Sequence, residues 1–194
     1  CSDKTGTLTQ NRMTVVEHYG DDEPLLATAM ALCSDAELGE DNAAVGEPTE
    51  CALVNYAYKL GLPKTELKQA QPRVGEAPFD SIRKMMSTVH KKDGAYIQYT
   101  KGAPDEVLKK CDCYYKNGEK LPLDDDARRG ILAANKEMAD KALRVLLAAT
   151  KSYDALPGDM SPEALENHLC FAGLVGMIDP VRGGAFAATA GARS

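Results

Sequence analysis

The chain has 194 residues, a formal net charge of −6 and 44% hydrophobic residues. This length suits one domain with an ordinary hydrophobic core. The mild acidity and the scattered basic residues argue against nucleic acid as a partner. No run approaches the ~20 apolar residues of a membrane span, and no basic-then-apolar leader opens the chain, so we expect a soluble, monomeric fragment. Six dispersed cysteines favour reduced thiols, and Cys111 and Cys113 lack the second pair typical of a zinc site.

Apolar periodicity, β-branched runs and turn residues predict alternating helices and strands. In chain order we expect a strand at 13–19, helices at 25–36, 47–61 and 65–71, strands at 73–79, 85–90 and 95–100, helices at 104–110 and 124–143, a strand at 144–150, a short helix from 161 and a strand at 169–178. Residues 35–46 are polar and predict a loop, whereas Asp93-Gly94 and Asn117-Gly118 are typical of tight turns. The order lacks a regular βαβ rhythm. It predicts an α/β (α+β) fold with a mainly antiparallel, twisted sheet flanked by helices.

The segment from Ser2 to Leu8 places one carboxylate, Asp3, among small hydroxyl residues, a lysine and a glycine. A phosphoryl acceptor needs these groups: an oxygen nucleophile, a neighbouring cation and a backbone that lets a phosphate approach. The alternative is a serine- and threonine-rich turn that enters a strand.

This opening segment resembles the phosphorylation loop of the P-type cation-transporting ATPases, whose aspartate receives the γ-phosphoryl of ATP. Further segments resemble the same family in the same chain order, and together they cover Cys1 to Arg182. These segments are 46–50, 78–86, 101–104, 143–146 and 176–182. The opening residues and Ala31 to Asp35 look most like type II, calcium-type pumps.

The resemblance implies a nucleotide-binding domain and roles for particular residues. The residues implied in binding ATP are Glu50, Phe79, Arg83, Lys84, Lys101, Gly102, Arg144, Asp179 and Arg182. The residues implied in phosphoryl transfer are Asp3, Lys4 and Thr5, with Asp3 and Thr5 also as ligands of Mg²⁺ in the full-length parent. The calcium pumps often carry an arginine where this chain has Ser81, which leaves open whether Arg83 or Lys84 follows the phosphates.

Elementary chemistry supports these roles beside simpler alternatives. Adenine is a flat ring, so a pocket needs an exposed aromatic face, which Phe79 supplies unless it packs inward. Lys101 is either a cation for phosphates or a solvated lysine at a strand end. Glu50 is either the acceptor of the adenine amino group or a first-turn helix acid. Arg144 is either a phosphate contact or a salt-bridged edge residue.

We expect four parts along the chain. Residues 1–12 form the phosphorylation loop and first hinge, 13–176 the nucleotide-binding domain, 177–182 the second hinge, and 183–194 a flexible tail whose composition looks foreign. The family's later Mg²⁺ motifs, its actuator loop and its membrane helices are not in this sequence. We therefore expect a fragment from the cytoplasmic side of a membrane-embedded pump, one that binds ATP or ADP but neither autophosphorylates nor transports.

Two other functions stay open. A stand-alone phosphatase of the haloacid dehalogenase type usually carries an acid two positions after its aspartate, where this chain has Thr5. A non-enzymatic nucleotide-binding module would share the pocket but would not need the motif around Asp3. The remaining phosphorylation, actuator and membrane domains of the parent are the expected protein partners.

Overall fold

The computed structural model describes residues 13–20, 22–39, 44–116 and 119–178. Its helices are α2 (Glu23–Leu32), α3 (Pro48–Lys59), α4 (Lys64–Ala70), α5 (Pro104–Leu108), α6 (Asp125–Asp140) and α7 (Pro162–Leu165). Its large sheet contains β1 (Thr14–Tyr19), β4 (Arg73–Asp80), β5 (Met85–Lys92), β6 (Ala95–Gly102), β7 (Cys111–Lys116), β8 (Glu119–Pro122), β9 (Leu143–Tyr153) and β10 (Leu169–Ile178). Two short strands, β2 (Glu37–Leu38) and β3 (Ala44–Val45), pair separately.

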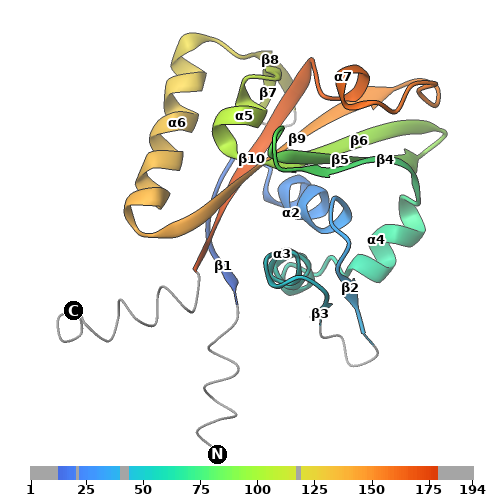
Figure 1. Cartoon of the computed structure of the whole chain (residues 1–194), viewed down its shortest axis with the longest axis horizontal. Helices are drawn as coiled ribbons and strands as arrows, with labels where there is room; N and C mark the ends of the chain where they lie inside the picture. Colours follow the sequence, from blue (N-terminus) through green and yellow to red (C-terminus); the bar gives the residue numbers. More distant parts are fainter. Residues whose placement is uncertain (1–12, 21, 40–43, 117–118, 179–194) are drawn as a thin grey trace, which may run out of the picture.

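The large sheet has the order β4-β5-β6-β9-β10-β7-β8, and β1 also pairs with β10 (Figure 1). Among the described pairings only β7 with β10 is parallel, so the predicted mainly antiparallel sheet flanked by helices is confirmed. β1 and β10 lie side by side, with Thr14 opposite Ile178.

Most predicted elements are confirmed, including the hairpin between β5 and β6. Its turn residues Asp93 and Gly94 have φ of 50° and 82°, as a two-residue hairpin turn requires. The sequence analysis missed β7 and β8, and residues 35–46 contain β2 and β3 instead of only a loop. The turn predicted at 117–118 lies outside the described residues. β9 extends beyond its predicted end to Tyr153.

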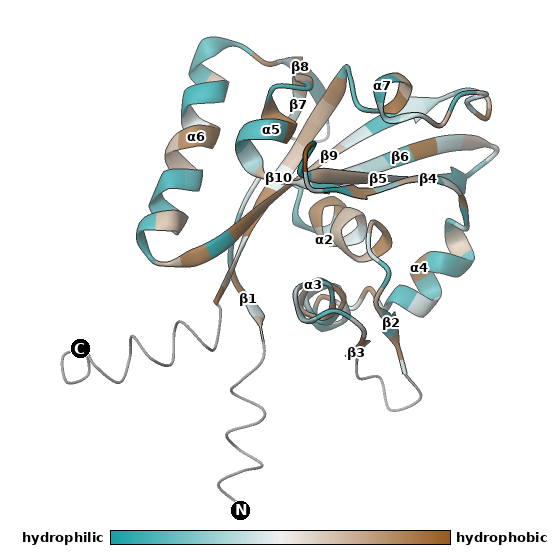
Figure 2. Ribbon diagram, viewed as in Figure 1, coloured by the Kyte–Doolittle hydropathy of each residue, from teal (hydrophilic) through white to brown (hydrophobic). Residues whose placement is uncertain are grey.

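Helices cover both faces of the sheet (Figure 1). α2 and α3 pack on one face, where Leu26, Met30 and Leu53 are fully buried. α5 and α6 pack on the other, around Val107, Ile131 and Phe171. α2 and β10 are largely apolar and α6 is mostly polar (Figure 2), because α2 lies between the sheet and α3 whereas α6 has a solvent side. Within the described residues, every helix is too short or too polar to cross a bilayer.

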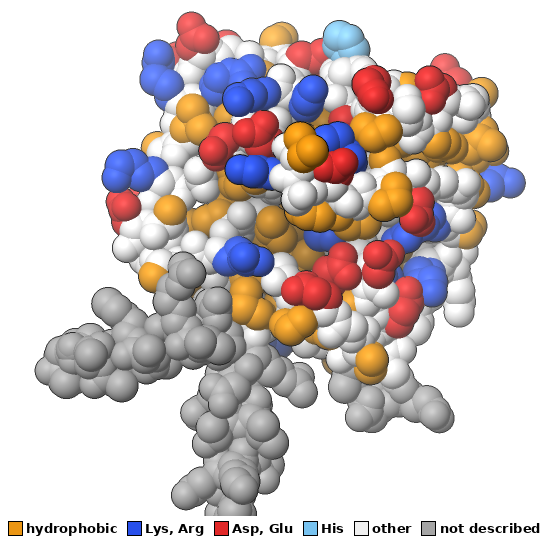
Figure 3. Space-filling model, in the orientation of Figure 1, with side chains coloured by type: hydrophobic (Ala, Val, Ile, Leu, Met, Phe, Trp, Pro, Cys, Tyr) orange, Lys and Arg blue, Asp and Glu red, His pale blue; other side chains and the backbone are white. Residues whose placement is uncertain are grey.

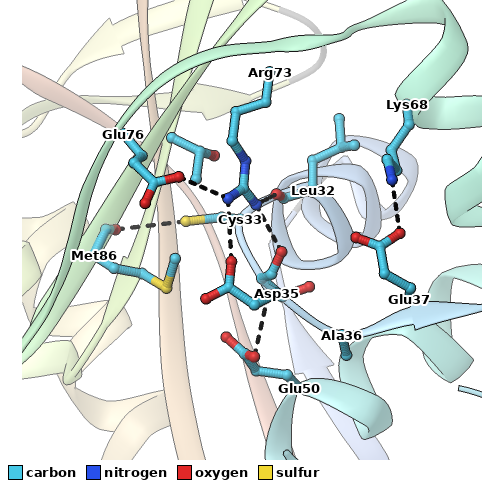
Figure 4. Close-up of polar contacts among 12 residues, drawn as sticks. Leu32, Cys33, Asp35, Ala36, Glu37, Glu50, Lys68, Arg73, Glu76 and Met86 are labelled. Atoms are coloured by element: carbon cyan, nitrogen blue, oxygen red, sulfur yellow. Dashed lines mark hydrogen bonds and ion pairs between the residues drawn. The ribbon is translucent and has the colours of Figure 1, made fainter. Parts of the chain in front are cut away.

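Cations from three other elements bind the carbonyl end of α2, which has no basic residue in its own last turn. The Arg73 guanidinium donates to the carbonyls of Leu32 (3.1 Å) and Ser34 (2.7 Å) (Figure 4). Lys101 Nζ donates to the Cys33 carbonyl at 2.6 Å. The last carbonyls of a helix lack partners within the helix and carry partial negative charge; here the Leu32 carbonyl belongs to α2, and those of Cys33 and Ser34 follow it directly.

Lys64 completes this arrangement from α4. Its ammonium is 1% exposed and donates to the carbonyls of Ser34 (2.9 Å) and Ala36, with Glu37 at 3.5 Å. Burial lowers the pKa of Lys64, and the Glu37 carboxylate partly offsets that shift. We call residues 32–36 and their three cations, Lys64, Arg73 and Lys101, the α2 carbonyl cap.

His90 is buried beside this cap as a neutral imidazole. Its Nδ1 lies 2.9 Å from the Gln71 carbonyl, which can only accept, so Nδ1 carries the proton. Its Nε2 then accepts from the Thr88 hydroxyl at 2.8 Å. Burial is the main cause that lowers the pKa of His90 from 6.5 to about 4, and the nearby cations Arg73 and Lys64 act in the same direction.

We expect His90 to make folding stability depend on pH. Because the folded pKa lies below the unfolded one, this contribution is complete above pH 6.5 and is lost as the pH falls to about 4. In that window the free energy of unfolding should fall more steeply in the unaltered chain than in His90→Gln. The difference between the two slopes should reach about 1.4 kcal/mol per pH unit. Urea unfolding at several pH values measures both slopes. Equal dependence of the unfolding free energy on pH in the two proteins would contradict a buried, neutral His90.

We expect Lys64→Met to destabilise the fold by about 1–3 kcal/mol, because the Ala36 carbonyl loses its cationic donor inside the protein. Lys68→Met is the matched control, since Lys68 is half exposed and forms an ion pair with Glu37 at 2.9 Å. An exposed ion pair of this kind contributes less than about 1 kcal/mol. Denaturant midpoints of the two variants test the difference. Equal losses of stability would mean that the buried Lys64 ammonium contributes no more than the exposed Lys68 ion pair.

Candidate functional site

Strand register places several predicted site residues on the sheet face that carries α2 and α3. Lys101 in β6 lies opposite Met86 in β5 and Ala148 in β9. The register of β4 against β5 shifts between Ala77 and Asp80, so Pro78 and Phe79 share the place opposite Met86. With strands about 4.8 Å apart, Phe79 and Lys101 are about 10 Å apart across the sheet.

Phe79 does not pack inward. Its side chain is 61% exposed, although most large apolar side chains of the described chain are buried. The inward-packing alternative is therefore wrong, and one aromatic face is open at the edge of the α2 and α3 face. Ile82, in the turn after β4, is 87% exposed.

Lys101 and Glu50 form an ion pair under α3. Lys101 Nζ lies 3.1 Å from Glu50 Oε2, and the two side chains are 8% and 14% exposed. The ammonium's other contacts are the Cys33 carbonyl and the Met86 sulfur at 3.2 Å, so its three protons are all in use. Glu50 Oε1 accepts from the backbone N–H of Asp35 at 3.1 Å (Figure 4). Lys101 is thus no solvated strand-end lysine; it holds Glu50 against the α2 carbonyl cap.

Arg144 lies at the start of β9 on the same face. Its side chain is exposed, and its guanidinium donates to the Thr49 hydroxyl of α3 at 3.4 Å. No carboxylate pairs with it among the salt bridges of the described residues, so the salt-bridged alternative is not supported. Arg144 is therefore an available cation next to Glu50. Acidic side chains gather over α2 and α3 on the surface seen in Figure 3.

Arg83 is not brought to this group. Its Nε donates to Glu166 Oε1 at 2.6 Å, and Ser87 donates to the other carboxylate oxygen at 2.8 Å. Ser87 alternates with Met86 along β5, so its side chain lies on the face opposite Lys101. Glu166, which the sequence analysis missed, is 3% exposed and has no local sequence signal. The expected nucleotide contact of Arg83 is not supported by its placement.

Lys84, just before the start of β5, lies beside Gly102, the last residue of β6. The Lys84 backbone has φ of 62°, a left-handed conformation unusual for a lysine, and its side chain is exposed. A Cβ on Gly102 would lie 2.3 Å from the Lys84 carbonyl oxygen and 2.6 Å from Met85 Cβ. The missing side chain of Gly102 makes room for the neighbouring strand and so lets Lys84 take its position.

Other features of the described chain do not coincide with this group. Three cavities of about 300–360 Å³ lie elsewhere: between β7 and α6, between β1 and α3, and beside Lys64 and Arg73. In the part that the structure describes, no three or more His, Cys, Asp or Glu side chains are arranged to hold a metal ion. Five predicted residues lie outside the described residues, namely Asp3, Lys4, Thr5, Asp179 and Arg182.

Comparison with known proteins identifies the family. Residues 24–184 match the family model described as P-type ATPase, cytoplasmic domain N. The chain is 43% identical to calcium-transporting ATPase 1 of Bacillus cereus, covering 94% of this chain and 22% of that protein. It is 37% identical to calcium-transporting ATPase 1 of Lactococcus lactis (94% and 22%) and 35% identical to a calcium-transporting ATPase of Listeria monocytogenes (96% and 23%). The chain spans about a fifth of these relatives, and it belongs to the family of cytoplasmic N domains of P-type ATPases.

Proposed function

We propose that the α2 and α3 face binds the adenosine part of ATP. The observation that carries this proposal is the exposed phenyl ring of Phe79 on the same face as the buried Lys101–Glu50 ion pair. An exposed aromatic ring on the same face as a fixed carboxylate fits a purine, because the ring can stack on the base while the carboxylate accepts from the exocyclic amino group.

Each residue of the proposed site has a separate task. Phe79 stacks on adenine, and Glu50 accepts from its amino group with lone pairs that Lys101 and Asp35 leave unused. Lys101 orients Glu50 and does not contact phosphate, because its three protons are already donated. The exposed cations Arg144 and Lys84 are the phosphate contacts that this geometry favours.

In the whole protein, we propose that the bound ATP transfers its γ-phosphoryl to Asp3, with Lys4 and Thr5 beside it. Mg²⁺ on Asp3 and Thr5 would neutralise phosphate charge in that transfer. The names of the relatives further suggest a pump for cations, of the calcium class. The phosphorylation, actuator and membrane domains of such a pump would be partners of this domain, with Asp179 and Arg182 in the second hinge.

We expect Phe79→Ala to weaken ADP binding about tenfold or more, because stacking of a base on an aromatic side chain contributes about 1–3 kcal/mol. The matched control is Val74→Ala, which removes another exposed apolar side chain of β4 (41% exposed). Calorimetric titration with ATP, ADP and AMP measures the effect. AMP should lose as much affinity as ATP. Undiminished binding by Phe79→Ala would contradict the proposed location of the site.

We expect Glu50→Ala to reduce discrimination between AMP and IMP, which carries a carbonyl where AMP has its amino group. The unaltered chain should prefer AMP by about tenfold, because IMP presents an acceptor to the Glu50 carboxylate. In Glu50→Ala the ratio of dissociation constants should approach one. Asp93→Ala, in the exposed turn between β5 and β6, is the control and should keep the preference. An unchanged ratio in Glu50→Ala would exclude Glu50 from base recognition.

A further inference from the structure

A single side chain ties together both ends of the turn between β4 and β5. This turn follows Phe79 and contains Lys84, both proposed nucleotide contacts. The Arg83 guanidinium Nη2 donates to the carbonyl of Pro78 at 3.0 Å and to that of Met85 at 3.1 Å. Because these two carbonyls flank the turn on either side, Arg83 fixes how far apart its ends lie.

The same guanidinium binds a buried carboxylate from a distant part of the chain. Nε donates to Glu166 Oε1 at 2.6 Å, and Nη2, whose two protons are shared among three oxygens, lies 3.1 Å from Oε2, a two-point geometry that fixes the plane of the guanidinium. Glu166 is 3% exposed, follows α7 and also accepts from Ser87. The Glu166 contact raises the pKa of Arg83, which keeps its guanidinium charged. A buried carboxylate without its cation is costly, which keeps Arg83 where it is.

The backbone on the other side of the turn is equally constrained. The Lys84 N–H donates to the Asp80 carbonyl at 2.6 Å, and the Lys84 carbonyl accepts from the Ala103 N–H at 3.0 Å. The left-handed conformation of Lys84 is strained and persists only while its surroundings hold it. If Arg83 released the turn, Lys84 would relax toward an ordinary conformation.

We propose that Arg83 and Glu166 are positioning residues for the nucleotide: from the opposite face of the sheet they hold Phe79 and Lys84 in their binding positions. This inference rests on the proposed function. It makes affinity for adenosine depend on the segment around α7, which contributes no side chain to the α2 and α3 face. Neither Arg83 nor Glu166 contacts the ligand in this arrangement.

The test compares ADP with adenosine in Glu166→Gln and Arg83→Lys. Glu166→Gln removes the charge and keeps the shape, whereas Arg83→Lys keeps the charge and loses the two-point geometry. Dissociation constants are measured by NMR titration at a temperature well below each variant's midpoint of thermal unfolding, so that unfolding does not affect the measured affinity. Asp140→Asn, which breaks the exposed Lys136–Asp140 pair of α6, is the control and should leave both constants unchanged.

We expect adenosine to weaken about threefold to tenfold, because a displaced Phe79 affects the base, and ADP to weaken at least as much, because Lys84 is displaced from its phosphates as well. Amide signals of Phe79, Ile82 and Lys84 should shift in both variants before ligand is added. The double variant should bind no worse than the weaker single one, since the two residues act as one unit. If Glu166→Gln does not fold, Arg83→Lys carries the same comparison.

Other results overturn the proposal in distinguishable ways. Loss for ADP with adenosine unaffected would overturn the proposal, because it would show that the pair does not hold Phe79. Unchanged affinity for both ligands would show that the pair serves stability alone. Absence of ADP binding to the unaltered chain, or full binding by Phe79→Ala, would overturn the proposed function itself and this inference with it.

Discussion

The electrostatic attraction between the carbonyl end of α2 and three cations organises this domain. A helix that ends inside a protein must find partners for its last carbonyls, and α2 has no basic residue of its own there. Lys64, Arg73 and Lys101 come from α4, β4 and β6, so one helix end connects the sheet to the helical layer. The thiol of Cys33 lies within this cap, where burial raises its pKa and keeps it protonated.

The same cap shapes the proposed nucleotide site. Lys101 belongs to the cap and to the ion pair with Glu50, and the Asp35 N–H donates to Glu50 from the cap's edge. The carboxylate that we assign to base recognition is therefore held from two directions before any ligand arrives. Such preorganisation reduces the entropy lost on binding. In this proposal, base specificity and folding depend on the same polar contacts.

The elements with local signals could be predicted from the sequence. The Asp93-Gly94 turn, the acidic cap of α6 and the apolar run of β10 each have a pattern that depends only on neighbouring residues. β7 was missed because its half-buried residues, including adjacent tyrosines, alternate weakly, and β8 is only four residues long.

The site was predictable only in part, since motif resemblance says which residues gather but not what each one touches. The Arg83 contact with Glu166 spans 83 residues of chain, and no local pattern announces it. The tight approach at Gly102 likewise depends on the neighbouring strand, and a lone glycine does not reveal which group comes close.

The pairing of β1 with β10 has a further consequence. Thr14 lies opposite Ile178, and Ile178 also lies opposite Leu143 of β9, so both ends of the described chain belong to neighbouring strands of one sheet. Hydrogen bonds join these strands along their length, so a torque applied at both ends together would turn the sheet as one piece without unravelling it.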